Sequence, residues 1–126
     1  MKRLVIPVCI LLGLLGLSIF SSRALSNLTE HCVTQLHLAQ EMAQQEDWEQ
    51  ARTITHDTFQ TWQSHGFALH ALLRHAETDD ILLSFRCVEQ YLDLEEMDQY
   101  AAANITLITQ LELLAEMEQA TLENVL

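Results

Sequence analysis

Six histidines and a series of carboxylates are the residues of this sequence whose chemistry could support catalysis or metal binding. The stretch WQSHGFALHALLRHAETDD (residues 62–80) holds three of these histidines at steps of five and ends in acids. Two histidines that bind one metal from a single helix are usually three or four residues apart, because this spacing puts both on one face. No two of the six have that spacing, and His70 and His75 lie about 140° apart around a helix. A metalloprotease-type histidine pair is therefore absent.

A second candidate site lies at the end of this stretch. One imidazole and several carboxylate oxygens could together hold a divalent cation. The same acids suit the start of a helix, because the helix dipole favours negative charge there. The sequence is compatible with both interpretations, a cation site and ordinary helix capping. The residues concerned are His75, Glu77, Asp79 and Asp80.

The cysteines form no catalytic or redox motif. Neither Cys32 nor Cys87 lies in a CxxC pair, and no strand–turn–helix elbow presents a serine. These two cysteines are candidates for a disulfide, which an exported domain can keep. The alternative is that both are free and buried, where thiols behave as small hydrophobic groups. We expect no catalytic residue and no bound cofactor, and hence that the protein is not an enzyme.

Charge is distributed very unevenly along the chain. All 18 acidic residues lie at or after Glu30, and only three arginines accompany them beyond residue 24, a net charge of −15 for residues 25–126. Such a surface repels phosphate groups, so nucleic acid and anionic lipid headgroups are excluded as partners of this part. A partner should be basic, cationic or apolar, although high charge also simply keeps a domain soluble.

The N-terminal 24 residues differ from the rest. Residues 4–20 are almost wholly apolar and follow the basic start MKR, so we expect them to enter the lipid bilayer as a short transmembrane signal anchor. This prediction places the N-terminus in the cytoplasm and residues 25–126 outside the cell membrane as one extracytoplasmic domain. Cleavage after Ala24 is the alternative, and it would release a secreted chain starting at Leu25.

The remainder predicts an all-α fold. Beyond residue 24 there is no proline and Gly66 is the only glycine, so tight hairpins of strands are disfavoured. Caps and apolar spacing indicate four to five helices that form a small antiparallel bundle. The first helix begins near residue 26 or continues from the apolar segment. The others cover residues 48–65, 67–75, about 79–93 with a cap at Thr78 or Asp79, and 98–122.

Each long predicted helix has an apolar stripe at steps of three and four residues. We expect these stripes to face a common core. They consist of Leu28, Cys32, Leu36, Ala39 and Ala43; of Ala51, Thr55, Phe59 and Trp62; of Ile81, Phe85, Val88 and Leu92; and of Ile105, Ile108, Leu111, Leu114 and Ala115.

Several short motifs, in order along nearly the whole chain, resemble one known family. They are DWEQA, a second tryptophan at Trp62, RHAETDDI, YLDLEEMD and the closing TLENVL. This pattern is similar to the bacterial domain of unknown function family 4363, small proteins with an N-terminal membrane helix. Ala120 and Thr121 stand where the family usually has proline and serine, and the domain lacks the family's lysines. The resemblance implies a membrane helix followed by an extracytoplasmic helical domain, with no assigned activity.

Two functional hypotheses follow. The first is a membrane-anchored, non-catalytic interaction or accessory module that binds a membrane or extracytoplasmic protein. The alternative is an extracytoplasmic sensor of a cation or small ligand, centred on His75, Glu77, Asp79 and Asp80. The partner, ligand and oligomeric state do not follow from the sequence.

Overall fold

The computed structural model describes residues 2–65 and 75–125, and these residues are almost entirely helical. The four long helices are α1 (Lys2–Gln44), α2 (Trp48–Ser64), α4 (His75–Asp93) and α5 (Met97–Val125). The all-α prediction is confirmed for this part of the chain. Gly66 and nearly all of the short helix predicted for residues 67–75 lie outside the described residues.

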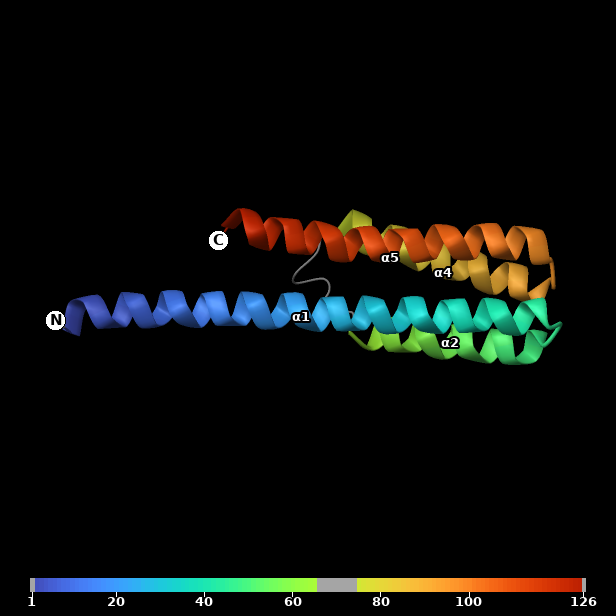
Figure 1. Ribbon diagram of the computed structural model, residues 1–126, viewed down its shortest axis with the longest axis horizontal. Helices are drawn as coiled ribbons and strands as arrows, with labels where there is room; N and C mark the ends of the chain where they lie inside the picture. Colours follow the sequence, from blue (N-terminus) through green and yellow to red (C-terminus); the bar gives the residue numbers. More distant parts are fainter. Residues whose placement is uncertain (1, 66–74, 126) are drawn as a thin grey trace.

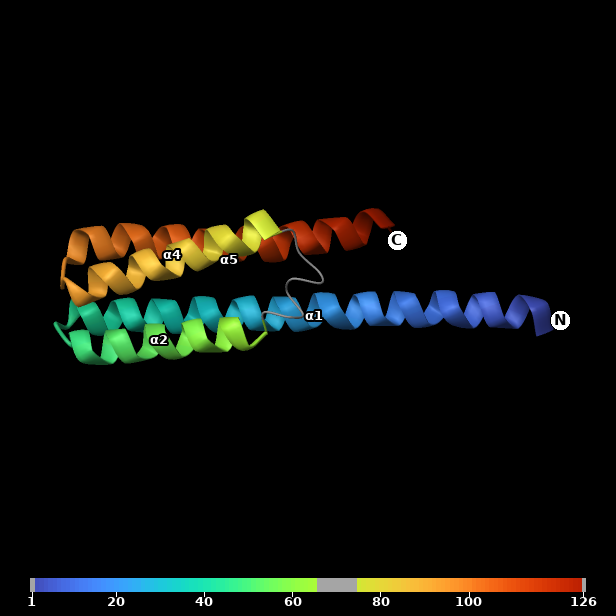
Figure 2. The same ribbon diagram turned by 180° about the vertical axis from the view of Figure 1, so that it is seen from behind.

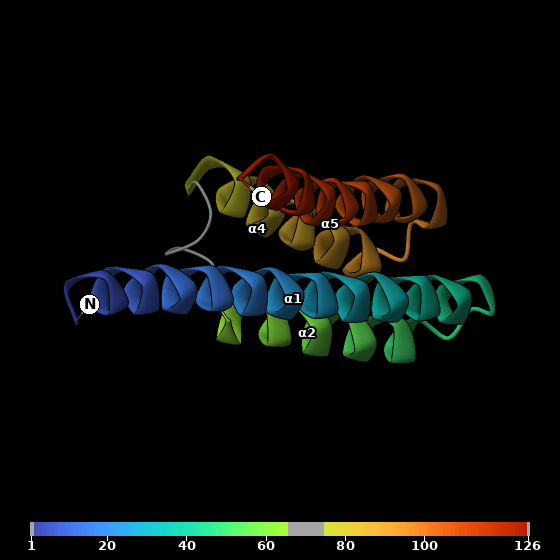
Figure 3. The same ribbon diagram turned by 60° about the vertical axis from the view of Figure 1, so that its left-hand side comes forward.

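The helices run alternately up and down and form an elongated four-helix bundle (Figure 1). Helix α1 contacts α2 and α5, while α4 contacts α5 and, more sparingly, α2. The bundle is thus two hairpins, α1/α2 and α4/α5, laid side by side, as the turned view shows (Figure 3). Both hairpin turns lie at one end of the bundle, and both chain ends point the other way (Figure 2).

The two hairpin turns have the same conformation. Glu46 and Glu95, 49 residues apart, have positive φ angles of 66° and 54°. In each turn the amide of that glutamate bonds to the carbonyl three residues earlier, and the next amide bonds to a carbonyl five residues earlier. This is the Schellman arrangement, which ends a helix with one left-handed residue. Asp47 then caps α2 by accepting a hydrogen bond from the Gln50 amide at 3.3 Å.

The buried positions repeat at the same interval of 49 residues. The inner face of α2 consists of Ala51, Thr55, Thr58, Phe59 and Trp62; that of α5 includes Tyr100, Asn104, Leu107, Ile108 and Leu111. The same interval relates the inner faces of α1 and α4. The second hairpin therefore repeats the first in structure, although few residue identities accompany the repeat.

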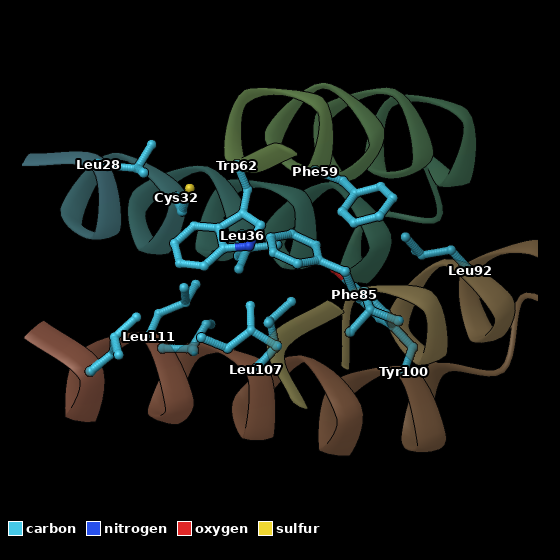
Figure 4. Packing of buried hydrophobic residues seen from close by; sticks show 14 of the residues in the cluster. Leu28, Cys32, Leu36, Phe59, Trp62, Phe85, Leu92, Tyr100, Leu107 and Leu111 are labelled. Carbon is cyan, nitrogen blue, oxygen red and sulfur yellow. The ribbon is translucent and has the colours of Figure 1, made fainter. Parts of the chain in front are cut away.

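One core runs between the hairpins. Phe85 of α4 packs against Phe59 and Trp62 of α2, with ring centroids 5.1 and 6.5 Å apart (Figure 4). Leucines of α1 and α5, such as Leu36 and Leu111, close the core from the other side. The stripes predicted for the first, second and fourth helices are all buried. Since both hairpins contribute to one core, they should unfold together.

The stripe predicted for α5 is partly wrong. Ile108, Leu111 and Leu114 are buried as expected, but Ile105 is 54% exposed. The apolar side chain of Ile105 suggested a position on the inner face of the helix. Tyr100 and Asn104 occupy the inner face at this end of α5 instead. Helix α4 also begins earlier than predicted, at His75 rather than after Thr78 or Asp79.

Helix α1 is much longer than its partners, because it continues without a break from Lys2 to Gln44. Its first turns extend past the rest of the bundle (Figure 1). Most of the large apolar residues between Leu4 and Phe20 are exposed, and only Leu15 and Ile19 are partly buried. Among the described residues, no helix reaches the combination of length and hydropathy that is required to span a membrane.

Candidate functional site

The predicted cation site is only partly described by the structure. The side chains of His75 and Glu77 lie outside the described residues, and those of Asp79 and Asp80 are exposed to solvent near the start of α4. Acids here are favoured by the helix dipole even without a ligand. In the described part of the chain, no three histidine, cysteine or acidic side chains are grouped closely enough to hold a metal ion.

A polar cluster that the sequence did not single out joins α2 to α4. His56 Nδ1 lies 3.3 Å from Glu89 Oε1, and its other ring nitrogen lies 3.2 Å from Gln60 Nε2. Arg52 Nη1 donates to the carbonyl of Leu92 at 3.2 Å. These groups are satisfied by one another and largely exposed. Each pair should therefore stabilise the contact between the hairpins by about 1 kcal/mol or less. They are better explained as structural contacts than as a ligand site.

A buried polar group lies inside the bundle. Asn104 Nδ2 donates to the carbonyl of Leu36 at 3.1 Å and to Gln40 Oε1 at 2.9 Å. Thr55 lies beside Tyr100, and burial raises the pKa of the Tyr100 phenol, with a small opposing effect of Thr55. Thr55 Oγ1, the phenol oxygen and Asn104 Oδ1 have no hydrogen-bond partner among the described residues. Thr55 and Asn104 occupy equivalent positions of the two hairpins. We call Thr55, Tyr100 and Asn104 the polar layer, and this layer follows the repeat.

The two candidate disulfide cysteines are both free in the structure. Cys32 points into the core and is fully buried, whereas Cys87 is exposed on α4. Burial raises the pKa of the Cys32 thiol to about 11, so this group stays protonated at neutral pH. The alternative interpretation, a buried thiol that acts as a small hydrophobic group, fits Cys32 and does not fit Cys87.

The most distinctive surface feature is a groove of about 390 Å³ along the outer side of the α4/α5 hairpin. We call it the α4/α5 groove. A separate hollow of about 180 Å³ lies between the same two helices, nearer the open end of the hairpin, next to Leu113. None of the residues that line the main groove is charged, although the chain is strongly acidic. They are Leu83, Ser84, Cys87, Tyr91, Gln99, Ala102, Ala103 and Thr106.

The first hairpin offers an internal comparison for this groove. At the positions 49 residues earlier, Thr34 replaces Leu83, Gln45 replaces Leu94, and Asp57 replaces Thr106. Among the described residues between 25 and 117, six large apolar side chains are exposed: five belong to the α4/α5 hairpin, with Leu94 in its turn, and the sixth is Leu38 of α1. The shared backbone therefore does not require an apolar outer face. The large exposed side chains at positions 83, 94 and 113 distinguish the second hairpin from the first.

Sequence reasoning missed this groove because it treated each helix separately. The signal that could have revealed it is the repeat in the hairpin turns. Glu46 and Gln50 are identical to Glu95 and Gln99, and acids occupy two of the three positions between them in both turns. Aligning the hairpins on these turns shows which exposed positions are polar in one and apolar in the other.

The sequence profile of one family, described as a domain of unknown function (DUF4363), matches residues 19–125. The chain belongs to this family. The DUF4363 match covers both hairpins, including the α4/α5 groove and the polar layer. No curated protein and no solved structure matches the chain significantly. The DUF4363 assignment confirms the resemblance seen in the short motifs and brings no activity with it.

Proposed function

We propose that this protein is a non-catalytic interaction module whose helical domain binds a partner protein through the α4/α5 groove. The observation that carries the proposal is the exposed, uncharged apolar surface of the second hairpin, where large exposed leucines occupy positions that are polar in the first hairpin, such as Leu83 against Thr34 and Leu113 against Ser64. Monomeric soluble proteins rarely leave large continuous apolar patches exposed, and such patches often mark interaction sites. No arrangement of nucleophile, base or metal ligands among the described residues suggests chemistry instead.

The proposal includes attachment to the cell membrane through residues 4–20. This segment supports it by being helical and apolar on every side while lying outside the bundle, since a helix of this kind is normally buried in protein or lipid. The N-terminus would then be cytoplasmic and residues 25–126 extracytoplasmic. Mass spectrometry of the protein from its own cells tests this: an intact N-terminus supports the anchor, and a chain starting at Leu25 shows a secreted form.

Site-specific photo-crosslinking tests the binding function. A benzophenone amino acid replaces Leu83 in the groove or, as the matched control, its counterpart Thr34 on the first hairpin. Irradiation of intact cells should give protein adducts from position 83 and few from position 34. Equal yields from the two positions would contradict the proposal.

The cation-sensor hypothesis has less support among the described residues, where only Asp79 and Asp80 can be assessed and both are exposed. It has a simple test in the full-length chain. Alanine at His75, Glu77, Asp79 and Asp80 together should abolish any rise in melting temperature caused by zinc, manganese or calcium. A chain whose melting temperature none of these ions changes has no such site.

A further inference from the structure

The length of the α4/α5 groove limits what can lie in it. The residues that line the groove and the separate hollow include a stretch along α4 from Asp80 to Tyr91 and one along α5 from Gln99 to Leu113. At 1.5 Å per residue these spans are about 16 and 21 Å. Three to four turns of a helix have the same length. A single amphipathic helix laid between two helices buries such a stripe in the way that helix-in-groove complexes do.

The charges around the groove define the chemistry of this helix further. Asp79 and Asp80 lie at one end, and Glu95, Glu96 and Asp98 lie at the hairpin end; all five are exposed. From residue 79 to residue 117 the sequence has nine acidic residues and a single basic one, Arg86. An uncharged floor between two acidic ends is complementary to an apolar stripe with basic residues at both ends.

We propose, building on the interaction function above, that the occupant of the α4/α5 groove is an amphipathic helix of another protein. Its apolar stripe is three to four turns long and is flanked by lysine or arginine. The stripe covers Leu83, Cys87 and Ala102, and the flanking cations face the acidic ends of the groove.

The alternatives fit the charges less well. A second copy of this chain would bring acidic ends against acidic ends in either orientation, and like charges in a contact are unfavourable. The anionic surface of a bilayer would be repelled by the same acids. Both alternatives are outcomes of the experiment below.

The experiment uses the full-length chain in a non-ionic detergent and three synthetic 18-residue helical probes. The first has a leucine stripe with lysine flanks; the second has glutamate in place of lysine; the third keeps lysine but has glutamine in place of leucine. Binding is measured by fluorescence anisotropy of labelled probes. The groove variant is Leu83→Gln with Leu113→Gln, and the matched control is Thr34→Gln with Ser64→Gln at the equivalent positions of the first hairpin. All four positions are exposed, so both double variants should fold.

The proposal predicts that the leucine–lysine probe binds and that the groove variant weakens this binding at least tenfold, while the control changes it less than twofold. Equal binding of the lysine–glutamine probe would show mere charge attraction and overturn the proposal. If the glutamate probe bound as tightly as the leucine–lysine probe, or more tightly, the proposed cationic flanks would be wrong. A dimer of the unliganded chain that the groove variant abolishes would identify a second copy as the occupant, and binding to anionic vesicles that this variant abolishes would identify a lipid surface.

The two levels of the proposal fail separately. If none of the probes binds but Leu83 still gives adducts with another protein in cells, the cationic helix is wrong and the interaction function stands. If Leu83 gives no more adducts than Thr34, the interaction function itself is wrong.

Discussion

The two hairpins of this bundle share a backbone and an inner face but differ on the outside. Both turn through a left-handed glutamate, Glu46 or Glu95, and both bury side chains at the same intervals. The outer face of α1/α2 has residues such as Thr34 and Asp57, whereas the outer face of α4/α5 has leucines and a groove without charge. The inner faces are held alike because they build one core. The outer faces do not contribute to this core, so they can differ. The residues that fold the bundle are therefore distinct from those that we propose bind a partner.

The largest effect should come from truncating equivalent core residues of the two hairpins. Phe85→Ala should lower the free energy of unfolding by about 3–5 kcal/mol and Leu36→Ala by about 2–5 kcal/mol, because both side chains are fully buried. Urea unfolding followed by far-ultraviolet circular dichroism measures this. Both variants should keep a single transition. A second transition in either variant would show that the hairpins fold separately, contrary to the shared core.

The polar layer allows a sharper comparison at equivalent positions. Asn104→Ala should cost about 1–3 kcal/mol, because the change removes two hydrogen bonds and leaves Gln40 Oε1 without its donor. Thr55→Val should be neutral or slightly stabilising, since the Thr55 hydroxyl has no partner among the described residues. Equilibrium unfolding of the two variants tests this contrast. An equal loss in both would mean that Thr55 makes a hydrogen bond in solution.

Both hairpin turns should accept glycine, with the smaller gain at Glu95, because the Glu95 carboxylate also pairs with Arg52 at 3.5 Å. A non-glycine residue in the left-handed region is strained by about 1–2 kcal/mol, which glycine avoids. Glycine also costs more entropy on folding, so Glu46→Gly and Glu95→Gly should each gain about 1 kcal/mol or less. Thermal unfolding of both variants measures the gain. A loss of stability at one turn only would show that the turns are not equivalent.

The smallest effect concerns Cys32, whose counterpart in the second hairpin is Ile81. Burial raises the pKa of the folded thiol from 9.0 to about 11, so the folded chain holds this proton more tightly than the unfolded chain does. The resulting stability is present below pH 9 and is lost as the pH rises toward 11, with a loss of about 1 kcal/mol by pH 10. Cys32→Val should remove this pH dependence, and unfolding at pH 8 and pH 10 tests it. Tyr100 contributes in the same direction above pH 10 in both proteins, so the difference between the proteins isolates Cys32.

The inner faces were predictable from the sequence because apolar side chains mark them at helical intervals. Leu36, Phe59 and Phe85 all have the predicted burial. The prediction was wrong at Ile105, because the polar Asn104 occupies the core position beside it, where hydrogen bonds to α1 that no local pattern reveals offset its cost. The groove lies between two helices, so it depends on how α4 and α5 pack. Its residues, such as Leu83 and Ala102, are unremarkable along the chain.

The central claim is that the α4/α5 groove is occupied by a partner while the matching face of the first hairpin is not. Single cysteines at Leu83, Ala102 and Leu113, and at their counterparts Thr34, Thr53 and Ser64, can be compared in a background with Cys9→Ser and Cys87→Ser, in which Cys32 remains but is buried. Each cysteine is labelled with a hydrophilic maleimide in cells whose outer layers have been permeabilised to the reagent. The same labelling is repeated on the purified protein. We expect the three groove cysteines to react with the maleimide at least fivefold more slowly in cells than in the purified protein, with no such difference for the three counterparts. Equal protection of both faces, or protection of neither, would contradict it.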